Sequence, residues 1–252
     1  MKARGGRVVA LWKLAAVIWL LLTARSKPLQ DSPSIARATA KPIVLPRDAA
    51  SLILLRLERR ETHVLMGRRS LSARFMPGFY VFPGGRAAAT DKAQLCVEPQ
   101  QQQGDHSLMR AAIRETYEET GLLFGRPARH ASEPPLQLSA LESAYLAQGL
   151  CPAIDALRYI GRAITPRQSA IRFNTRFFVA DGLLARGNLV GNGELDDLGW
   201  RAVAECLSLP MADVTRFMLE RAVSVSARSE RDSVIYYYVK GSPRVRREEA
   251  GA

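Results

Sequence analysis

The chain has 252 residues, of which 47% are hydrophobic, so it is long and apolar enough to bury the core of one large domain. Its three cysteines have neither paired nor metal-ligand spacing, which argues for a reducing compartment and against a disulfide scaffold. The net charge of +12 is high, but residues 1–34 carry +5 of it and residues 241–252 carry +1. The remaining +6 fits a pocket for a small polyanionic substrate, and no nucleic-acid partner is expected.

The first 41 residues differ from the rest of the chain. A basic start precedes an apolar run over residues 8–24, which Lys13 interrupts. This run is short and charged for a spanning helix. The sparse, odd cysteine count favours an intracellular domain, so an upstream extension or a weak anchor is favoured over a cleaved signal. We expect a cytoplasmic protein, with a membrane anchor through residues 8–24 as the alternative. The predicted organisation is an extension and linker (1–41), one domain (42–240) and a disordered tail (241–252).

The predicted elements of the domain begin with two strands. Residues 49–57 are almost entirely apolar and predict a buried strand, with residues 62–67 as its partner. A short strand over residues 80–82 ends at Pro83. The pair Gly84 and Gly85 then allows a tight turn and a close approach of the backbone.

A helix is predicted over residues 108–120. Asp105 or Ser107 can cap its start, and Gly121 is a typical C-terminal stop. Its expected core face consists of Met109, Ala112, Ile113, Thr116 and Tyr117.

The remaining predicted elements follow in chain order at residues 136–164 (a helical insertion around Pro152), 173–180 (an apolar strand), 198–201 (a short element), 210–218 (a helix) and 234–239 (a terminal strand). The three tyrosines of the last element are flanked by β-branched residues, which favours a strand over a stacking platform for bases. This order of elements predicts an α+β fold with a mixed sheet.

The helix over residues 108–120 gathers three carboxylates on one face. Glu115, Glu118 and Glu119 stand at positions i, i+3 and i+4, where like charges repel and weaken an isolated helix. Such a cluster requires a compensating cation, and carboxylate oxygens suit Mg²⁺ or Mn²⁺. From this helix alone, a solvated acidic face is the alternative interpretation.

Together with the residues upstream, the helix resembles the Nudix hydrolase signature. That signature is Gly, five residues, an acid, seven residues, then Arg-Glu-apolar-any-Glu-Glu-any-Gly-apolar, and it corresponds here to Gly85, Asp91 and residues 114–122. The chain has Asp91 where the family usually has Glu, and Thr116 at an apolar position. It also has 22 residues rather than seven between Asp91 and Arg114. The extra residues are polar and Gln-rich, which predicts an exposed, mobile loop inserted over residues 92–104.

This resemblance implies an α/β/α sandwich with a mixed sheet and a metal-dependent diphosphatase activity. It implies that Glu118 and Glu119 ligate Mg²⁺ or Mn²⁺, and that Glu115 ligates metal or acts as the general base. Arg114 is expected to be structural, orienting the carboxylates through charge-assisted hydrogen bonds. In this superfamily the base moves between the helix and a later loop, so Glu194, within the acidic segment 191–197, is the second candidate. A plain acidic turn is the alternative for that segment.

A second resemblance, to the coenzyme A diphosphatases of this superfamily, covers residues 65–85. The spacing of that motif is kept by Arg69, Ser70, Arg74, Gly78 and residues 82–85. Met66 and Gly67 depart from it, since the motif prefers Leu and Thr there. Residues 164–166 and 172–178 look like the corresponding segment of the peroxisomal members, which also carry an insertion.

The second resemblance implies a CoA-like nucleotide substrate, namely CoA or an acyl-CoA, split into 3′,5′-ADP and a 4′-phosphopantetheine product. Guanidinium groups suit phosphate oxygens, so Arg69 and Arg74 are candidate substrate contacts, with a weaker claim for Arg172. Gly84 and Gly85 are candidate substrate-binding positions as well. The alternatives are another nucleoside diphosphate derivative, such as ADP-ribose or NADH, and a non-catalytic ligand-binding module, against which the intact glutamate triad argues. An RNA-processing hydrolase is favoured only by the basic charge.

Overall fold

The computed structural model describes residues 44–92, 106–128, 138–228 and 232–248. All of them belong to one unit, residues 43–252, while the predicted extension and linker (1–41) lie outside the described residues. The same holds for residues 93–104 of the predicted inserted loop. In the described ranges, no helix is long and apolar enough to cross a membrane.

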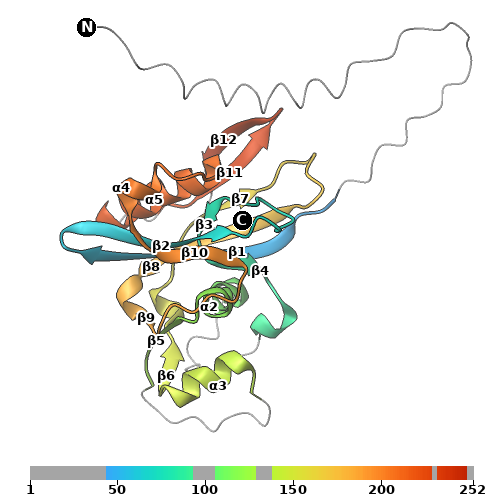
Figure 1. Ribbon diagram of the computed structural model, residues 1–252. Helices are drawn as coiled ribbons and strands as arrows, with labels where there is room; N and C mark the ends of the chain where they lie inside the picture. The colour runs from blue at the N-terminus through green and yellow to red at the C-terminus, as the bar shows by residue number, and fades with distance from the viewer. Residues whose placement is uncertain (1–43, 93–105, 129–137, 229–231, 249–252) are drawn as a thin grey trace, which may run out of the picture. The chain divides into compact units, whose positions relative to one another are not determined.

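A mixed sheet forms the centre of the fold, and nine of the described strands belong to it (Figure 1). Seven strands run in the order β10-β2-β1-β8-β7-β11-β12, with β3 added to β2 and β4 added to β1. Their bounds are β1 Arg47–Glu58, β2 Glu61–Arg69, β3 Tyr80–Val81, β4 Gly84–Arg86, β7 Arg158–Ile164, β8 Phe173–Asp181, β10 Leu195–Ala202, β11 Val234–Val239 and β12 Ser242–Arg247. The pairs β1–β8 and β7–β11 are parallel, and the other pairs are antiparallel.

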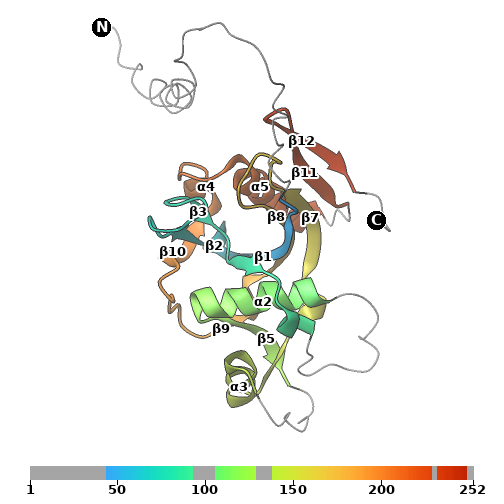
Figure 2. The same ribbon diagram turned by 90° about the vertical axis from the view of Figure 1, so that its right-hand side faces the viewer.

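Helices cover both faces of the sheet, as Figure 2 shows. Helix α2 (Ser107–Thr120) packs on one face, while α4 (Val203–Cys206) and α5 (Asp213–Arg228) lie on the other. Successive side chains of β1 point to opposite faces of the sheet, which explains the two cores. Leu52 and Leu54 pack with α2, whereas Ile53 and Leu55 pack with α5. The predicted α/β/α sandwich with a mixed sheet is therefore confirmed.

A smaller layer lies beyond α2. It consists of α3 (Ala140–Ala147) and a three-stranded sheet with the order β6-β5-β9. These strands span Leu150–Pro152, Leu123–Pro127 and Ala185–Arg186. Three short 3₁₀ turns complete the described elements, at Ala89–Lys92 (η1), Ile154–Ala156 (η3) and Gly182–Leu184 (η4).

The strands predicted at residues 49–57, 62–67, 80–82, 173–180 and 234–239 are all present, as are the short element at 198–201 and the helix that Gly121 ends. Gly121 has φ +73, the left-handed conformation of a helix C-cap. The predicted cap is wrong at Ser107, which lies inside the helix; His106 precedes it and makes no side-chain capping bond. Asp105 lies outside the described residues.

Three other predictions are corrected. Within the described part of the insertion at 136–164, the α-helix spans Ala140–Ala147, and the β-branched and aromatic residues of Arg158–Ile164 join the main sheet as β7. The helix predicted at 210–218 starts at Asp213 and continues to Arg228. Residues 242–247 of the predicted disordered tail form β12, because Lys240 and Gly241, with φ of +48 and +80, make a tight hairpin turn.

The spacing of the cysteines argued against a disulfide scaffold, but Cys151 takes part in a disulfide. Sequence spacing does not reveal such pairing, because the geometry of a disulfide depends on which side chains the fold brings together. Cys206 is free and buried.

Candidate active site

Gly84 and Gly85 let α2 and the sheet approach each other closely. A Cβ atom at Gly85 would lie 2.6 Å from the carboxylate carbon of Glu115, and one at Gly84 would lie 2.5 Å from the carbonyl oxygen of Ala50. The backbone N–H of Gly84 donates to Oε2 of Glu119 at 2.8 Å. The Gly-Gly turn therefore fits directly against the carboxylates of the helix. A side chain at Gly85 would displace Glu115, and one at Gly84 would collide with the backbone of β1.

A cavity of about 400 Å³ opens beside this turn. Glu115 and Glu119 line it from α2, and Glu194 lines it from the segment that precedes β10. Two cationic side chains, Arg69 and Arg86, also line it. The sheet therefore brings together the helix carboxylates and the loop carboxylate that the sequence singled out separately.

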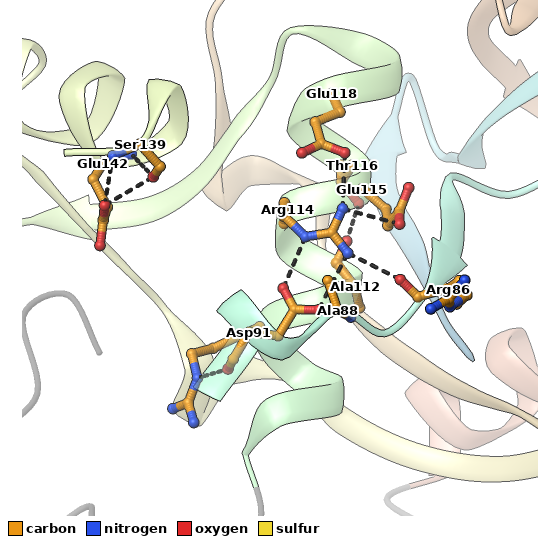
Figure 3. A network of polar contacts seen from close by, with 11 residues as sticks. Arg86, Ala88, Asp91, Ala112, Arg114, Glu115, Thr116, Glu118, Ser139 and Glu142 are labelled. Atoms are coloured by element: carbon orange, nitrogen blue, oxygen red, sulfur yellow. Dashed lines mark hydrogen bonds and ion pairs between the residues drawn. The ribbon is translucent and has the colours of Figure 1, made fainter. Parts of the chain in front are cut away.

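Arg114 organises the carboxylates from the side of α2 (Figure 3). Its Nε donates to Oδ1 of Asp91 at 2.8 Å, and its Nη1 lies 3.0 Å from Oε1 of Glu115 and 2.8 Å from Oε2 of Glu118. Its Nη2 donates to the carbonyl oxygen of Arg86 at 3.0 Å. Arg114 therefore joins Asp91, Glu115, Glu118 and the backbone of β4 in one network.

Asp91 fixes the position of the Arg114 guanidinium. Its side chain is buried and accepts a hydrogen bond from the backbone N–H of Ala88 at 2.6 Å, while Arg114 binds both of its oxygens. Asp91 thus reaches Arg114 despite the long spacer between them, because η1 brings it back against α2. The expanded spacer leaves this contact intact.

Burial and like charge act together on the two helix carboxylates in the cavity. Glu119 is 3% exposed, and its pKa is raised to about 8. Burial is the main cause, the neighbouring Glu115 and Glu194 contribute to the rise, and the Gly84 N–H bond opposes it. Burial also raises the pKa of Glu115, against the lowering effect of Arg114. Charged carboxylates are therefore costly here in the absence of a cation.

This donor set has the chemistry of a divalent cation site. Glu115, Glu119 and Glu194 offer carboxylate oxygens to one cavity, and Mg²⁺ or Mn²⁺ prefers such ligands. Glu118 is more exposed and is paired with Arg114 away from the cavity. Among the residues that the structure describes, no three acidic, histidine or cysteine side chains are grouped closely enough to enclose an ion as they stand. Because Glu118 is paired with Arg114, it would join a cation site in the cavity only by giving up that ion pair.

The candidate substrate contacts fare differently. Arg69 lines the cavity, and its Nε donates to the carbonyl oxygen of Phe75 at 2.9 Å. Arg74 is exposed and does not line the cavity. Arg172 is buried and donates to the carbonyl oxygens of Thr165 and Val44, so the substrate contact suggested for it is wrong and it holds backbone segments together.

Arg86 was not among the predicted site residues. Its neighbours in the sequence gave no signal, because its position at the cavity depends on the packing of β4 against α2.

Comparisons with known proteins agree with this architecture. No family model matches the chain. A curated relative, the putative nudix hydrolase 7 of Caenorhabditis elegans, is 33% identical over 142 residues, which are 53% of this chain but only 43% of that relative. The crystal structure of a NUDIX hydrolase from Alicyclobacillus acidocaldarius is 31% identical, with a TM-score of 0.58, and the match covers 73% of this chain and 93% of that one.

Proposed function

The chain belongs to the Nudix hydrolase superfamily, and on that premise we propose that it hydrolyses the diphosphate linkage of CoA or an acyl-CoA. The products are 3′,5′-ADP and a 4′-phosphopantetheine fragment. The observation that carries this proposal is that three carboxylates, two arginines and an apolar wall line the same cavity.

The residues divide the hydrolytic work among them. Glu115 and Glu119 would hold a divalent cation, joined by Glu118 once it leaves Arg114. When bound, that cation neutralises charge on the diphosphate and activates water. Arg69 and Arg86 contact non-bridging phosphate oxygens, which guanidinium groups suit.

We assign the general base to Glu194. Glu115 has Oε1 engaged by Arg114, whereas the exposed Glu194 lies at the cavity from a different segment and can take a proton from the attacking water. Backbone bonds hold its position, since the Glu194 N–H donates to Oδ1 of Asn192 at 2.9 Å and its carbonyl accepts from the N–H of Ser70 at 3.2 Å.

The apolar wall supports a substrate with an uncharged arm. Phe75 and Phe173 meet edge to face with ring centroids 5.5 Å apart, and Phe177 and Val214 continue the same lining. Because the two rings already contact each other, they form a continuous surface instead of a slot for a nucleobase. The pantetheine arm of CoA suits such a surface, while its 3′-phosphate and diphosphate require the arginines.

The substrate assignment is tested by kcat/KM for CoA, dephospho-CoA, ADP-ribose and NADH in the presence of Mg²⁺. We expect CoA to be the best of the four. A preference for ADP-ribose or NADH would reject the CoA assignment and leave a general Nudix diphosphatase.

The arginine contacts are tested by three matched variants. R69A and R86A should each lower kcat/KM for CoA by the loss of a charge-assisted contact of about 1.5–3 kcal/mol. R74A is the control, because Arg74 is exposed outside the cavity and should keep nearly full kcat/KM. Equal losses in all three variants would show that net charge, and not contact within the cavity, is responsible.

A further inference from the structure

The strand that follows Glu194 contains a β-bulge. Strand β10 pairs with β2, and the register shifts between Asp196 and Gly199, so that residues 197–198 lie opposite Gly67 alone. Asp197 has φ +46, a left-handed conformation that is uncommon outside glycine. An extra residue reverses which side chains face each side of the sheet, and bulges of this kind re-aim side chains beside active sites.

Two side chains hold the bulge in place. The hydroxyl of Tyr80 donates to Oδ2 of Asp197, and Nη2 of Arg201 lies 2.5 Å from Oδ1 of the same carboxylate. Nη2 of Arg201 also donates to the Asp197 carbonyl oxygen at 2.9 Å, and its guanidinium lies 5.3 Å from the centre of the Tyr80 ring. Asp197 is therefore fixed through both its side chain and its backbone.

This clamp connects the segment that binds Glu119 with the segment that supplies Glu194 to the cavity. Tyr80 begins β3, and the chain continues from it to Gly84, whose N–H binds Glu119. Asp197 lies three residues after Glu194, whose carbonyl oxygen accepts from Ser70. A bond between Tyr80 and Asp197 thus fixes one segment relative to the other.

Gly67 leaves room for the bulge. A Cβ atom at this position would lie 2.8 Å from Cβ of Leu195 and 3.2 Å from Cδ1 of Leu198, so a larger residue would push the start of β10 away. This accounts for the glycine at a position where the CoA-type motif prefers Thr.

We propose that Tyr80 and Asp197 are positioning residues: they fix the bulge and thereby aim Glu194 into the cavity. The inference rests on the proposed function in giving Glu194 a catalytic role. The clamp acts at a distance, since neither residue lines the cavity itself.

Amide hydrogen exchange tests the positioning without any reaction. Y80F removes only the hydroxyl, and we expect the Ser70 amide, which is bonded to the Glu194 carbonyl, to exchange several-fold faster than in wild type. Y159F is the matched control, because its hydroxyl also bonds a carboxylate, that of Glu248, away from the cavity. Unchanged Ser70 exchange in Y80F would overturn the proposal. If Y80F does not fold, D197N, with a half-exposed side chain, serves the same measurement.

A double-mutant cycle tests whether the clamp acts through Glu194. We expect Y80F to lower kcat on the order of ten-fold in the wild-type background, because small misplacements of catalytic groups are costly. In the E194Q background the same change should alter kcat by less than about two-fold, since the group it positions is gone. If Y80F lowers kcat by the same factor in both backgrounds, or if E194Q itself turns over like wild type, the claim that the clamp acts through Glu194 is overturned. A wild type that hydrolyses no diphosphate would reject the proposed function, while Ser70 exchange still decides the positioning.

Discussion

Glu119 carries a clear electrostatic cost. Its carboxylate is almost fully buried, has one backbone donor, and faces two further acids across the cavity. A carboxylate in such a position is stable either protonated or beside a cation. The pH dependence of the free energy of unfolding therefore reports the protonation state of Glu119.

The metal-free protein should therefore lose stability as pH rises. The folded pKa of Glu119, about 8, lies above its unfolded value of 4.5, so between these values the folded chain keeps a proton that the unfolded chain has released. The stabilisation is complete below about pH 4.5 and lost above about pH 8, and amounts to a few kcal/mol. E119Q should flatten this slope in urea unfolding with excess chelator, whereas E118Q, at an exposed site, should not. An unchanged slope in E119Q would contradict the assignment.

At the same scale, the sequence predicted the site unevenly. The helix spacing predicted three carboxylates on one face, and two of them, Glu115 and Glu119, line the cavity. Glu118 pairs with Arg114, a competition that the spacing alone does not reveal. Arg74 came from a motif in a loop, where spacing does not state where a side chain points. Arg86 needed the contact between β4 and α2, which only the fold supplies.

At the scale of the elements, those with a strong local signal were the ones predicted. Strand β1 is apolar on both faces because it is covered on both, and α2 ends at a glycine in the left-handed conformation. Strand β12 was missed because all of its side chains are exposed, so it has no apolar alternation to detect. Its pairing depends on the turn at Lys240–Gly241 and on the neighbouring strand β11.

That turn should respond strongly to substitution. Gly241 has φ +80, which a β-branched residue adopts only with strain, so G241V should destabilise the β11–β12 hairpin by about 1–3 kcal/mol. G199A is a suitable control, because a Cβ there meets nothing within 4 Å and its φ is not left-handed. Hydrogen exchange of the β12 amides should rise in G241V alone, and equal protection in both variants would show that the turn does not limit the hairpin.

At the scale of the whole molecule, the sandwich explains why the site lies where it does. Two cores, one on each face of the sheet, hold α2 against one face, while β10 pairs with β2 within the sheet. Strand β4 pairs with β1 and lines the cavity together with α2. The carboxylates therefore converge through the packing of elements that are distant in the sequence. Their mutual repulsion lowers the free energy of unfolding of the domain. Any cation that relieves the repulsion must stabilise the fold as well.

Divalent cations should consequently raise the melting temperature in a concentration-dependent way. A ligand that binds only the folded state at 100 times its Kd contributes about 2.7 kcal/mol, which for a domain of this size corresponds to a rise of roughly 5–10 °C. Mg²⁺ or Mn²⁺ should produce this rise in wild type, excess chelator should reverse it, and E115Q/E119Q should abolish it because both helix carboxylates in the cavity are then neutral. E220Q removes an exposed acid from α5 and should respond as wild type does, which separates the site from a general effect of charge. A full response in E115Q/E119Q would place the cation elsewhere and remove the metal from the proposed mechanism.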